Sequence, residues 1–270
     1  MSFAHRIASL MAALALTWVP ATSADTVITV GVYNFPPIAS VNATNQAEGL
    51  LGDLLNHLEA VHDDLSFRIF YTSPKRRHLD FQADLYDVIF FESPKWGWSG
   101  LETSVSAPVL TDEELYVALK KPGRTLDFFN HIADHRLVAM SGYHYEFADC
   151  ETDPDRLQKR FDIEFSSSHS RNLQLIKADR PSVAEIAIVS RSYLQQHLSK
   201  NPGDWDNLLI SDQPDQEYDL SIITRQDGPV NADDMMTLLA PLVANGSYRL
   251  LVERWGLQLP QGFLTSFNAP

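Results

Sequence analysis

The sequence is poor in cysteine and in basic residues. Cys150 is the only cysteine among 270 residues, which excludes an intramolecular disulfide. There are 21 Lys and Arg residues against 35 Asp and Glu, giving a formal net charge of −14 at pH 7. Such an acidic chain is unsuited to binding nucleic acid or an anionic membrane surface.

Long apolar runs are also scarce, and the longest lies at the N-terminus. The first 24 residues combine a charged start around His5 and Arg6, an apolar stretch over residues 7–19 and a small-residue end at Ala24. This stretch is shorter than the roughly 20 apolar residues that a membrane-spanning helix needs. The pattern predicts a cleavable signal peptide at residues 1–24 and export of a soluble chain, without a cysteine near the cleavage point for lipid attachment.

Motifs for catalysis, cofactors and metals are missing as well. There is no Gly-x-Ser-x-Gly sequence for a nucleophilic serine, and no glycine-rich phosphate loop follows the first predicted strand. His131 and His135 have the spacing of a helical metal site, but the predicted helix ends near Asp134, so His135 falls outside it. We therefore predict no catalytic residue, no cofactor and no metal.

What the sequence does contain is a regular alternation of strand and helix patterns. β-branched runs and Leu residues at helical spacing predict an α/β fold with parallel strands and right-handed crossovers. Two such units in series suggest two lobes joined by more than one crossing. The strands are expected at residues 26–33, 65–72, 86–91, 113–121, 135–140, 183–189 and 218–225, and the helices at 49–62, 73–85, 126–134, 169–177, 190–198, 232–244 and 247–257.

An unusual aromatic cluster, FFESPKWGWSG, follows the third predicted strand at residues 90–100. It contains Phe90, Phe91, Trp96 and Trp98 together with one carboxylate and one ammonium group. Rings at the end of a strand form either a corner of the core or a ligand-binding surface, and the residues alone leave both interpretations open.

The ordered set of segments resembles periplasmic solute-binding proteins of family 3, the amino-acid-binding type. The segments that carry the resemblance are VGVYNFPPI, GLLGDLLNHLE, YDVIFFESP, SAPVLTDEELYVAL, LVAMSGYHY, LQLIKADRPSVAEIAIV, YDLSIITR and LVANGSYRLLVERWG. The resemblance implies the two-lobed type II periplasmic binding fold, with each lobe a mostly parallel sheet flanked by helices and with two hinge crossings.

The resemblance also implies how the chain divides. Lobe 1 would combine residues 25–111 and 219–259, lobe 2 would be residues 112–218, and residues 260–270 would form a C-terminal tail. The hinge would lie near residues 111–115 and 216–220. The ligand would bind between the lobes, which would close over it by a hinge motion.

Two positions depart from the pattern of the family. Its amino-acid binders hold the ligand carboxylate with an arginine in a Thr-x-x-Arg context after the YDV strand, where this chain reads SPKW. The aspartate that usually meets the ligand amino group is matched by Ser190. We therefore expect a ligand that is not held as a standard α-amino acid, unless Arg76, Arg77 or Arg171 replaces the missing arginine.

Aromatic and weakly polar side chains remain at the matching positions, which suits a flat or hydrophobic small molecule. Glu92 among these rings would also suit an organic cation. The predicted ligand-binding residues are Tyr33, Phe35, Phe91, Glu92, Ser93, Trp96, Tyr143, His144, Arg171 and Ser190.

The expected function is that of a monomeric periplasmic receptor that delivers a small organic ligand to an ABC permease. One alternative is a periplasmic sensor or accessory binding protein. Another is a dehydratase-like enzyme on the same fold, which would need a titratable group in the cleft, with Glu92 and His144 as candidates.

Overall fold

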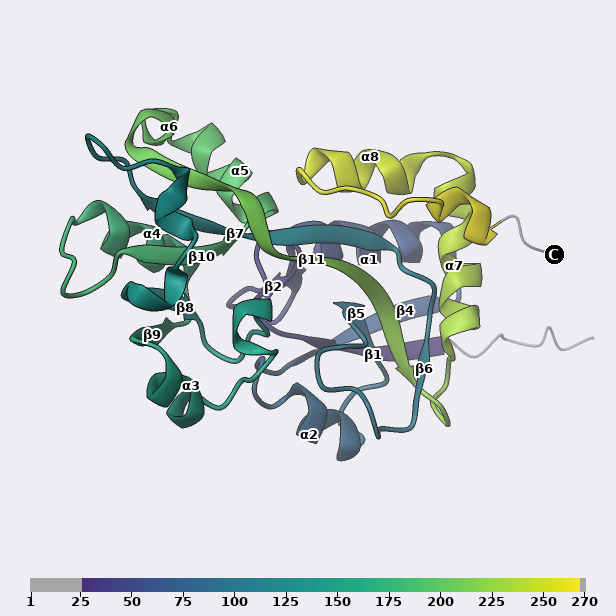
Figure 1. Cartoon of the computed structure of the whole chain (residues 1–270). Helices are drawn as coiled ribbons and strands as arrows, with labels where there is room; N and C mark the ends of the chain where they lie inside the picture. The colour runs from purple at the N-terminus through teal and green to yellow at the C-terminus, as the bar shows by residue number, and fades with distance from the viewer. Residues whose placement is uncertain (1–25, 268–270) are drawn as a thin grey trace, which may run out of the picture.

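Two lobes share one continuous sheet. The computed structural model describes residues 26–267, so the predicted signal peptide lies outside the described residues. The sheet has nine strands in the order β4-β1-β5-β11-β7-β10-β8-β9, with β6 paired to β11. The long strands β7 and β11 run from one lobe into the other (Figure 1).

Lobe 1 contains the first three long strands and helices from both ends of the described chain. Strand β1 pairs in parallel with β4 and β5, as the alternating pattern predicts. The elements of lobe 1 are β1 (Thr26–Val32), β2 (Ser40–Val41), β3 (Ala47–Glu48), α1 (Gly49–Val61), β4 (Leu65–Tyr71), α2 (Arg77–Gln82), β5 (Val88–Glu92), β6 (Thr103–Val105), α7 (Ala232–Ala244), α8 (Ser247–Arg254) and η4 (Phe263–Phe267).

Lobe 2 has a smaller parallel unit in which β8 lies between β9 and β10. Its helices are short, and residues 126–134, predicted as one helix, form two 3-10 turns instead. The elements of lobe 2 are η1 (Leu126–Phe129), η2 (Ile132–Asp134), β8 (Leu137–Met140), η3 (Glu146–Ala148), α3 (Pro154–Arg160), β9 (Ile163–Ser166), α4 (His169–Lys177), β10 (Ile186–Ser190), α5 (Arg191–Lys200) and α6 (Asp204–Asn207).

The two crossing strands, β7 (Leu110–Leu119) and β11 (Leu208–Arg225), pair with each other in antiparallel register. Gln216 lies opposite Glu114 and Leu220 lies opposite Leu110, so the two predicted hinge segments are hydrogen-bonded neighbours. Side chains alternate across a strand, so the pairing brings residues of β7 and β11 to the same face between the lobes.

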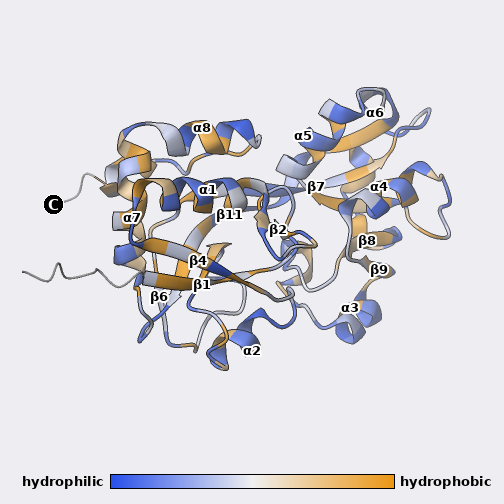
Figure 2. Cartoon of the chain, turned by 180° about the vertical axis from the view of Figure 1, so that it is seen from behind, coloured by the Kyte–Doolittle hydropathy of each residue, from blue (hydrophilic) through white to orange (hydrophobic). Residues whose placement is uncertain are grey.

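Apolar strands between amphipathic helices form the core. Helix α1 buries Leu50, Leu51, Leu54 and Leu58, which follow the helical spacing of the sequence. Figure 2 shows the hydrophobic colour on the strands of both lobes and a mixed colour on the covering helices. A second hydrophobic cluster in lobe 2 packs α4 and α5 against β7 and β10.

Local sequence patterns predicted some ends of helices and strands and missed others. Helix α2 begins at Arg77, not at Pro74, because the carbonyl of Ser73 accepts the amides of Arg76 and Arg77 in a turn. The two-residue strands β2 and β3, the edge strand β9 and strand β6 were not predicted. Residues 260–267 do not form a detached tail, since the ring of Phe263 is buried 5.4 Å from that of Tyr248.

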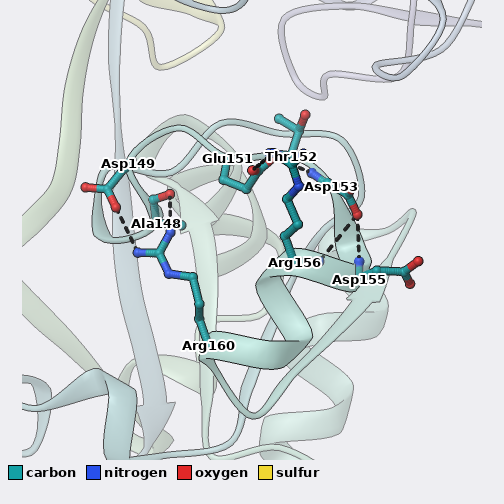
Figure 3. Close-up of polar contacts among 8 residues, drawn as sticks. All are labelled: Ala148, Asp149, Glu151, Thr152, Asp153, Asp155, Arg156 and Arg160. Atoms are coloured by element: carbon teal, nitrogen blue, oxygen red, sulfur yellow. Dashed lines mark hydrogen bonds and ion pairs between the residues drawn. The ribbon is translucent and has the colours of Figure 1, made fainter.

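Surface polar contacts fix the segment between η3 and α3 (Figure 3). Asp153 caps α3 by accepting the amides of Asp155 and Arg156. Arg156 also pairs with Glu151, at 3.1 Å between Nη1 and Oε2. These contacts stabilise the far end of the segment 143–156, which begins with Tyr143 between the lobes.

Candidate ligand-binding site

The candidate site lies where loops after three parallel strands meet between the lobes. Asn34–Pro37 follow β1, Ser93–Trp96 follow β5, and Ser141–Tyr145 follow β8. Open parallel sheets bind ligands beyond the carboxyl ends of their strands, so these loops occupy the expected position.

Aromatic rings from both lobes line the central cavity and touch one another. Phe35 of lobe 1 meets Tyr143 of lobe 2 edge to face, with ring centroids 5.6 Å apart. Trp96 of lobe 1 stacks on His144 of lobe 2, with centroids 6.1 Å apart and an interplanar angle of 11°. The cavity is lined by Tyr33, Phe35, Pro74, Arg77, Trp96, Glu114, Gly142, Tyr143, His144 and Gln216.

Hydrogen bonds also join the lobes at this face. The hydroxyl of Tyr143 donates to the backbone carbonyl of Asn34 at 3.1 Å. The side-chain amide of Asn34 donates to the backbone carbonyl of Ser167 at 3.2 Å. The free space in the cavity is about 10 Å³, roughly the room that one water needs. The described structure is therefore a closed arrangement in which the lobes are in contact.

Gly142 permits this close contact. Its φ is +80°, and a Cβ atom added there would lie 2.9 Å from Cγ of Lys75 and 3.0 Å from Cβ of Pro74. Both neighbours belong to lobe 1, whereas Gly142 follows β8 in lobe 2. Glycine therefore suits this position for two reasons: the backbone is left-handed, and a side chain would obstruct the approach of lobe 1 to lobe 2.

Arg77 is the arginine that reaches the cavity. Its guanidinium is 2% exposed and pairs with Glu92, at 3.2 Å between Nε and Oε2. The other guanidinium nitrogens donate to the carbonyls of Pro74 and Trp96. At least three of its five N–H donors are therefore engaged within lobe 1.

The other two candidate arginines do not line this cavity. Arg76 is exposed and pairs with Asp80 of its own helix, at 2.9 Å between Nη2 and Oδ1. Arg171 is exposed on α4, where its backbone amide donates to the capping Ser168. The prediction that Arg171 contacts the site is not supported by its position, because the N-terminal turn of α4 directs it to solvent.

Glu114 is the charged residue that the sequence analysis missed. It lies on β7, is 2% exposed and lines the cavity. The hydroxyl of Tyr218 donates to its Oε1 at 3.3 Å, while Oε2 has no hydrogen-bond partner among residues 26–267. Burial, followed by the charges of Asp112 and Asp215, raises its pKa well above the usual 4.5. The available signal was a pair of acids at alternate positions of the predicted crossing strand.

The predicted site residues fall into three groups. Tyr33, Phe35, Trp96, Tyr143 and His144 line the central cavity, and burial lowers the pKa of His144 to about 3. Ser93 lines an adjoining groove of about 580 Å³ together with Trp96 and Tyr218. The remaining predicted residues, Phe91, Glu92, Arg171 and Ser190, line none of the described cavities.

Each buried member of the last group has a local reason for its place. Phe91 has a φ of +60°, and its ring packs against Phe90 at 6.0 Å. Glu92 lies behind Arg77 and accepts Trp98 Nε1 at 2.8 Å. Ser190 precedes α5 as its N-cap residue and is fully buried. The cluster FFESPKWGWSG therefore serves both purposes, since Trp98 belongs to the core and Trp96 to the cavity.

Neither a metal centre nor a single membrane-spanning helix is found in the described part of the chain. Residues 26–267 contain no group of three His, Cys, Asp or Glu side chains that could hold a metal ion. No single helix there is long and apolar enough to cross a membrane, although α7 and α8 together, bent by 88°, meet the criteria of length and composition.

No family model and no curated protein matches the sequence, so the comparison rests on solved structures. A Streptococcus pneumoniae ABC uptake transporter substrate-binding protein with bound histidine is 15% identical, with a TM-score of 0.66 over 85% of this chain and 92% of that chain. EhuB in complex with hydroxyectoine is 17% identical, with a TM-score of 0.66 over 90% and 91%.

A third similar structure is the ancestral amino acid-binding protein AncCDT-1, a precursor of cyclohexadienyl dehydratase. It is 15% identical, with a TM-score of 0.60 over 85% of this chain and 95% of that chain. These similarities extend over nearly the whole described chain and confirm the predicted fold. The protein has the two-lobed type II periplasmic binding fold, built as an α/β sheet with flanking helices.

Proposed function

We propose that the protein is a periplasmic receptor that captures a small organic molecule between its lobes by hinge closure and delivers it to an ABC importer. The observation that carries this proposal is the aromatic cavity in which rings of lobe 1 contact rings of lobe 2. Among the strands of residues 26–267, only β7 and β11 run in the sheet from one lobe to the other, an arrangement suited to a hinge.

The hinge is proposed at residues 111–115 and 216–220. It divides the chain into lobe 1 at residues 25–111 and 219–259 and lobe 2 at residues 112–218. The protein would act as a monomer, because a cleft between two lobes of one chain needs no second subunit.

The ligand is proposed to bind in a way that differs from a standard α-amino acid. Arg77 is already paired with Glu92 and with two carbonyls, so a ligand carboxylate would have to compete for its remaining donors. Ser190 stands where the resemblance places an aspartate, and it is buried and does not line the cavity. Rings with a few polar groups favour stacking of a flat or apolar ligand body.

A binding role is favoured over an enzymatic one. Two of the three similar structures described above were determined with small organic ligands, histidine and hydroxyectoine, and the third is named as a binding protein. Of the two candidate acid–base groups, Glu92 is engaged by Arg77 and Trp98. His144 has its pKa lowered to about 3 by burial, which leaves the ring neutral near pH 7.

Native mass spectrometry of protein purified from its own periplasm tests the proposal by identifying what travels with it. A thermal-shift screen of metabolites provides a second readout, since a ligand at 100 times its Kd stabilises a protein by about 2.7 kcal/mol. We expect at least one compound to raise Tm. The absence of any copurified molecule and of any stabilising compound would contradict the proposal.

A further inference from the structure

We propose that the ligand is an organic cation and that Glu114 receives its positively charged group at the hinge side of the cavity. This inference rests on the proposed function and specifies its ligand class. The starting point is the free oxygen of Glu114, since a buried carboxylate without a partner is costly unless a partner arrives.

The charges of the cavity are unequal. Arg77 and Glu92 compensate each other, at 3.2 Å between Nε and Oε2. Glu114 lines the same cavity and forms no ion pair among residues 26–267, and the hydroxyl of Tyr218 donates its one hydrogen bond there. A ligand carrying one positive charge would stabilise the ionised form of this carboxyl group, whereas an anionic ligand would disfavour that form.

The two acids next to Glu114 already have partners of their own, and none of these partners compensates Glu114. Asp112 on the same strand accepts a bond from the Ser192 hydroxyl and lies 3.6 Å from Arg191. Asp215 accepts the Tyr116 hydroxyl and two backbone amides of the η3 segment, at 2.6–2.9 Å. Both acids are thus engaged by lobe 2 groups, and their negative charges further favour a cation beside Glu114.

The rings around the cavity provide the second element of recognition. Phe35, Trp96 and Tyr143 line the same space as Glu114 and come from both lobes. An ammonium group over aromatic faces is attracted by about 0.5–2 kcal/mol, more strongly when it is removed from water. In a complex the lobes would stand farther apart than in this structure, whose cavity has about 10 Å³ of free space, with the carboxylate and the rings around the cationic group.

Binding of a cation would be linked to release of a proton. Burial favours the neutral form of Glu114 in the closed structure, so the carboxyl group would lose its proton to the buffer as the cation binds. The titratable and charged groups that face Glu114 or share its cavity come from both lobes and both crossing strands. They are Tyr33, Arg77, Asp112, Tyr143, His144, Tyr145, Asp215 and Tyr218.

Calorimetric titrations with charge-matched probes test the inference. The probes are benzylammonium and choline as cations, benzyl alcohol as a neutral compound and benzoate as an anion. We expect at least one cation to bind at least about tenfold more tightly than the alcohol and benzoate, a difference of about 1.4 kcal/mol. Titrations in buffers of different ionisation enthalpy should report release of up to one proton per bound cation.

Two variants separate the role of Glu114 from general effects. Glu114→Gln keeps the shape of the side chain and should weaken cation binding at least about tenfold and abolish proton release. Glu113→Gln changes the next residue, whose carboxylate pairs with Arg191 at 2.8 Å on the other face of β7, and should leave both unchanged. Circular dichroism and Tm confirm that each variant is folded.

The outcomes distinguish this inference from the proposed function. Benzoate or benzyl alcohol binding as tightly as the cations, or Glu114→Gln retaining cation affinity within about twofold, would overturn the inference alone. The same holds if neither cation binds while the metabolite screen identifies a neutral or anionic ligand. If no probe and no metabolite binds, the proposed function fails with it.

Discussion

Tyr143 of lobe 2 donates a hydrogen bond to the carbonyl of Asn34 in lobe 1, across 109 residues of sequence and 3.1 Å of space. The same ring meets Phe35 edge to face, so one side chain joins the lobes through both a polar and an apolar contact. The loops after β1 and β8 thereby become the two sides of one closed cavity.

Replacing Tyr143 with Phe should shift the protein toward an open arrangement. The variant keeps the ring but removes the hydroxyl, and a hydrogen bond of this kind contributes about 0.5–1.5 kcal/mol. We expect a larger radius of gyration in solution scattering without ligand. Tyr145→Phe is the matched control, because the Tyr145 hydroxyl accepts the amide of Met140 within lobe 2, at 2.8 Å. An equal radius for Tyr143→Phe and the parent protein would refute the prediction.

Gly142→Ala should oppose closure by direct contact. The new methyl group would lie 2.9 Å from Lys75 Cγ and 3.0 Å from Pro74 Cβ. Its backbone strain, about 1–2 kcal/mol for a left-handed residue, must be separated from that contact. Gly123→Ala does this, because Gly123 has a φ of +75° and nothing within 4 Å of an added Cβ.

We expect both glycine variants to lose stability in urea unfolding, but only Gly142→Ala to scatter as an open form and bind ligand more weakly. Equal ligand affinity in the two variants would mean that Gly142 matters for its backbone conformation alone.

Breaking the Arg77–Glu92 pair should destabilise lobe 1 strongly. The two side chains are 2% and 0% exposed, so removing one partner leaves a buried charge, at a cost of about 3–5 kcal/mol. Arg77→Met and Glu92→Met should each show this loss in urea unfolding, and the double variant should recover a large part of it. The surface pair of exposed Arg156 and half-buried Glu151 is the control, since Glu151→Gln should cost less than about 1 kcal/mol. Additive losses in the double variant would argue against a coupled pair.

Glu114 should make the stability of the free protein fall as pH rises. Its pKa is raised above the usual 4.5 in the folded protein, so the folded form binds more protons than the unfolded form above that pH. The stabilising effect is full below about 4.5 and is lost as pH rises through the raised pKa, with a slope of at most about 1.4 kcal/mol per pH unit.

Glu114→Gln removes this dependence. The free energy of unfolding of the variant minus that of the parent protein should therefore increase from pH 5 to pH 8. Other shifted groups, including Asp112 with a pKa raised to about 6 and His169 with a pKa lowered to about 3, are present in both proteins. Their effects largely cancel in the difference. A difference that stays constant with pH would show that Glu114 does not titrate in this range.

Local patterns were sufficient to predict most of the fold. Leu residues at helical spacing gave α1, β-branched runs gave β1, β5 and β10, and the Asn245–Gly246 turn separated α7 from α8. These features depend on neighbours within a few residues, which the sequence displays directly. The short edge strand β9 and the 3-10 turns after β7 carry weaker local signals and were missed or misassigned.

The candidate site was only partly visible in the sequence. Tyr33, Phe35, Trp96, Tyr143 and His144 could be placed in the cavity through the resemblance to family 3 binding proteins, and the structure brings them to the strand ends. The roles of the charged residues were not visible. Glu92 was expected to face the ligand, yet Arg77 and Trp98 engage it from within lobe 1.

The sequence by itself determined an α/β chain with aromatic loops at its strand ends and without the usual carboxylate-binding arginine. Only the tertiary structure decided that Arg77 is paired with Glu92 and that Gly142 allows the close approach of lobe 1. It also decided that Glu114 lines the cavity with one oxygen, Oε2, that has no hydrogen-bond partner among residues 26–267. The physical reason is that charge compensation and burial depend on groups brought together by strand pairing. Gln216 and Glu114 become neighbours through the register of β7 and β11, although 102 positions (216 minus 114) separate them in the chain.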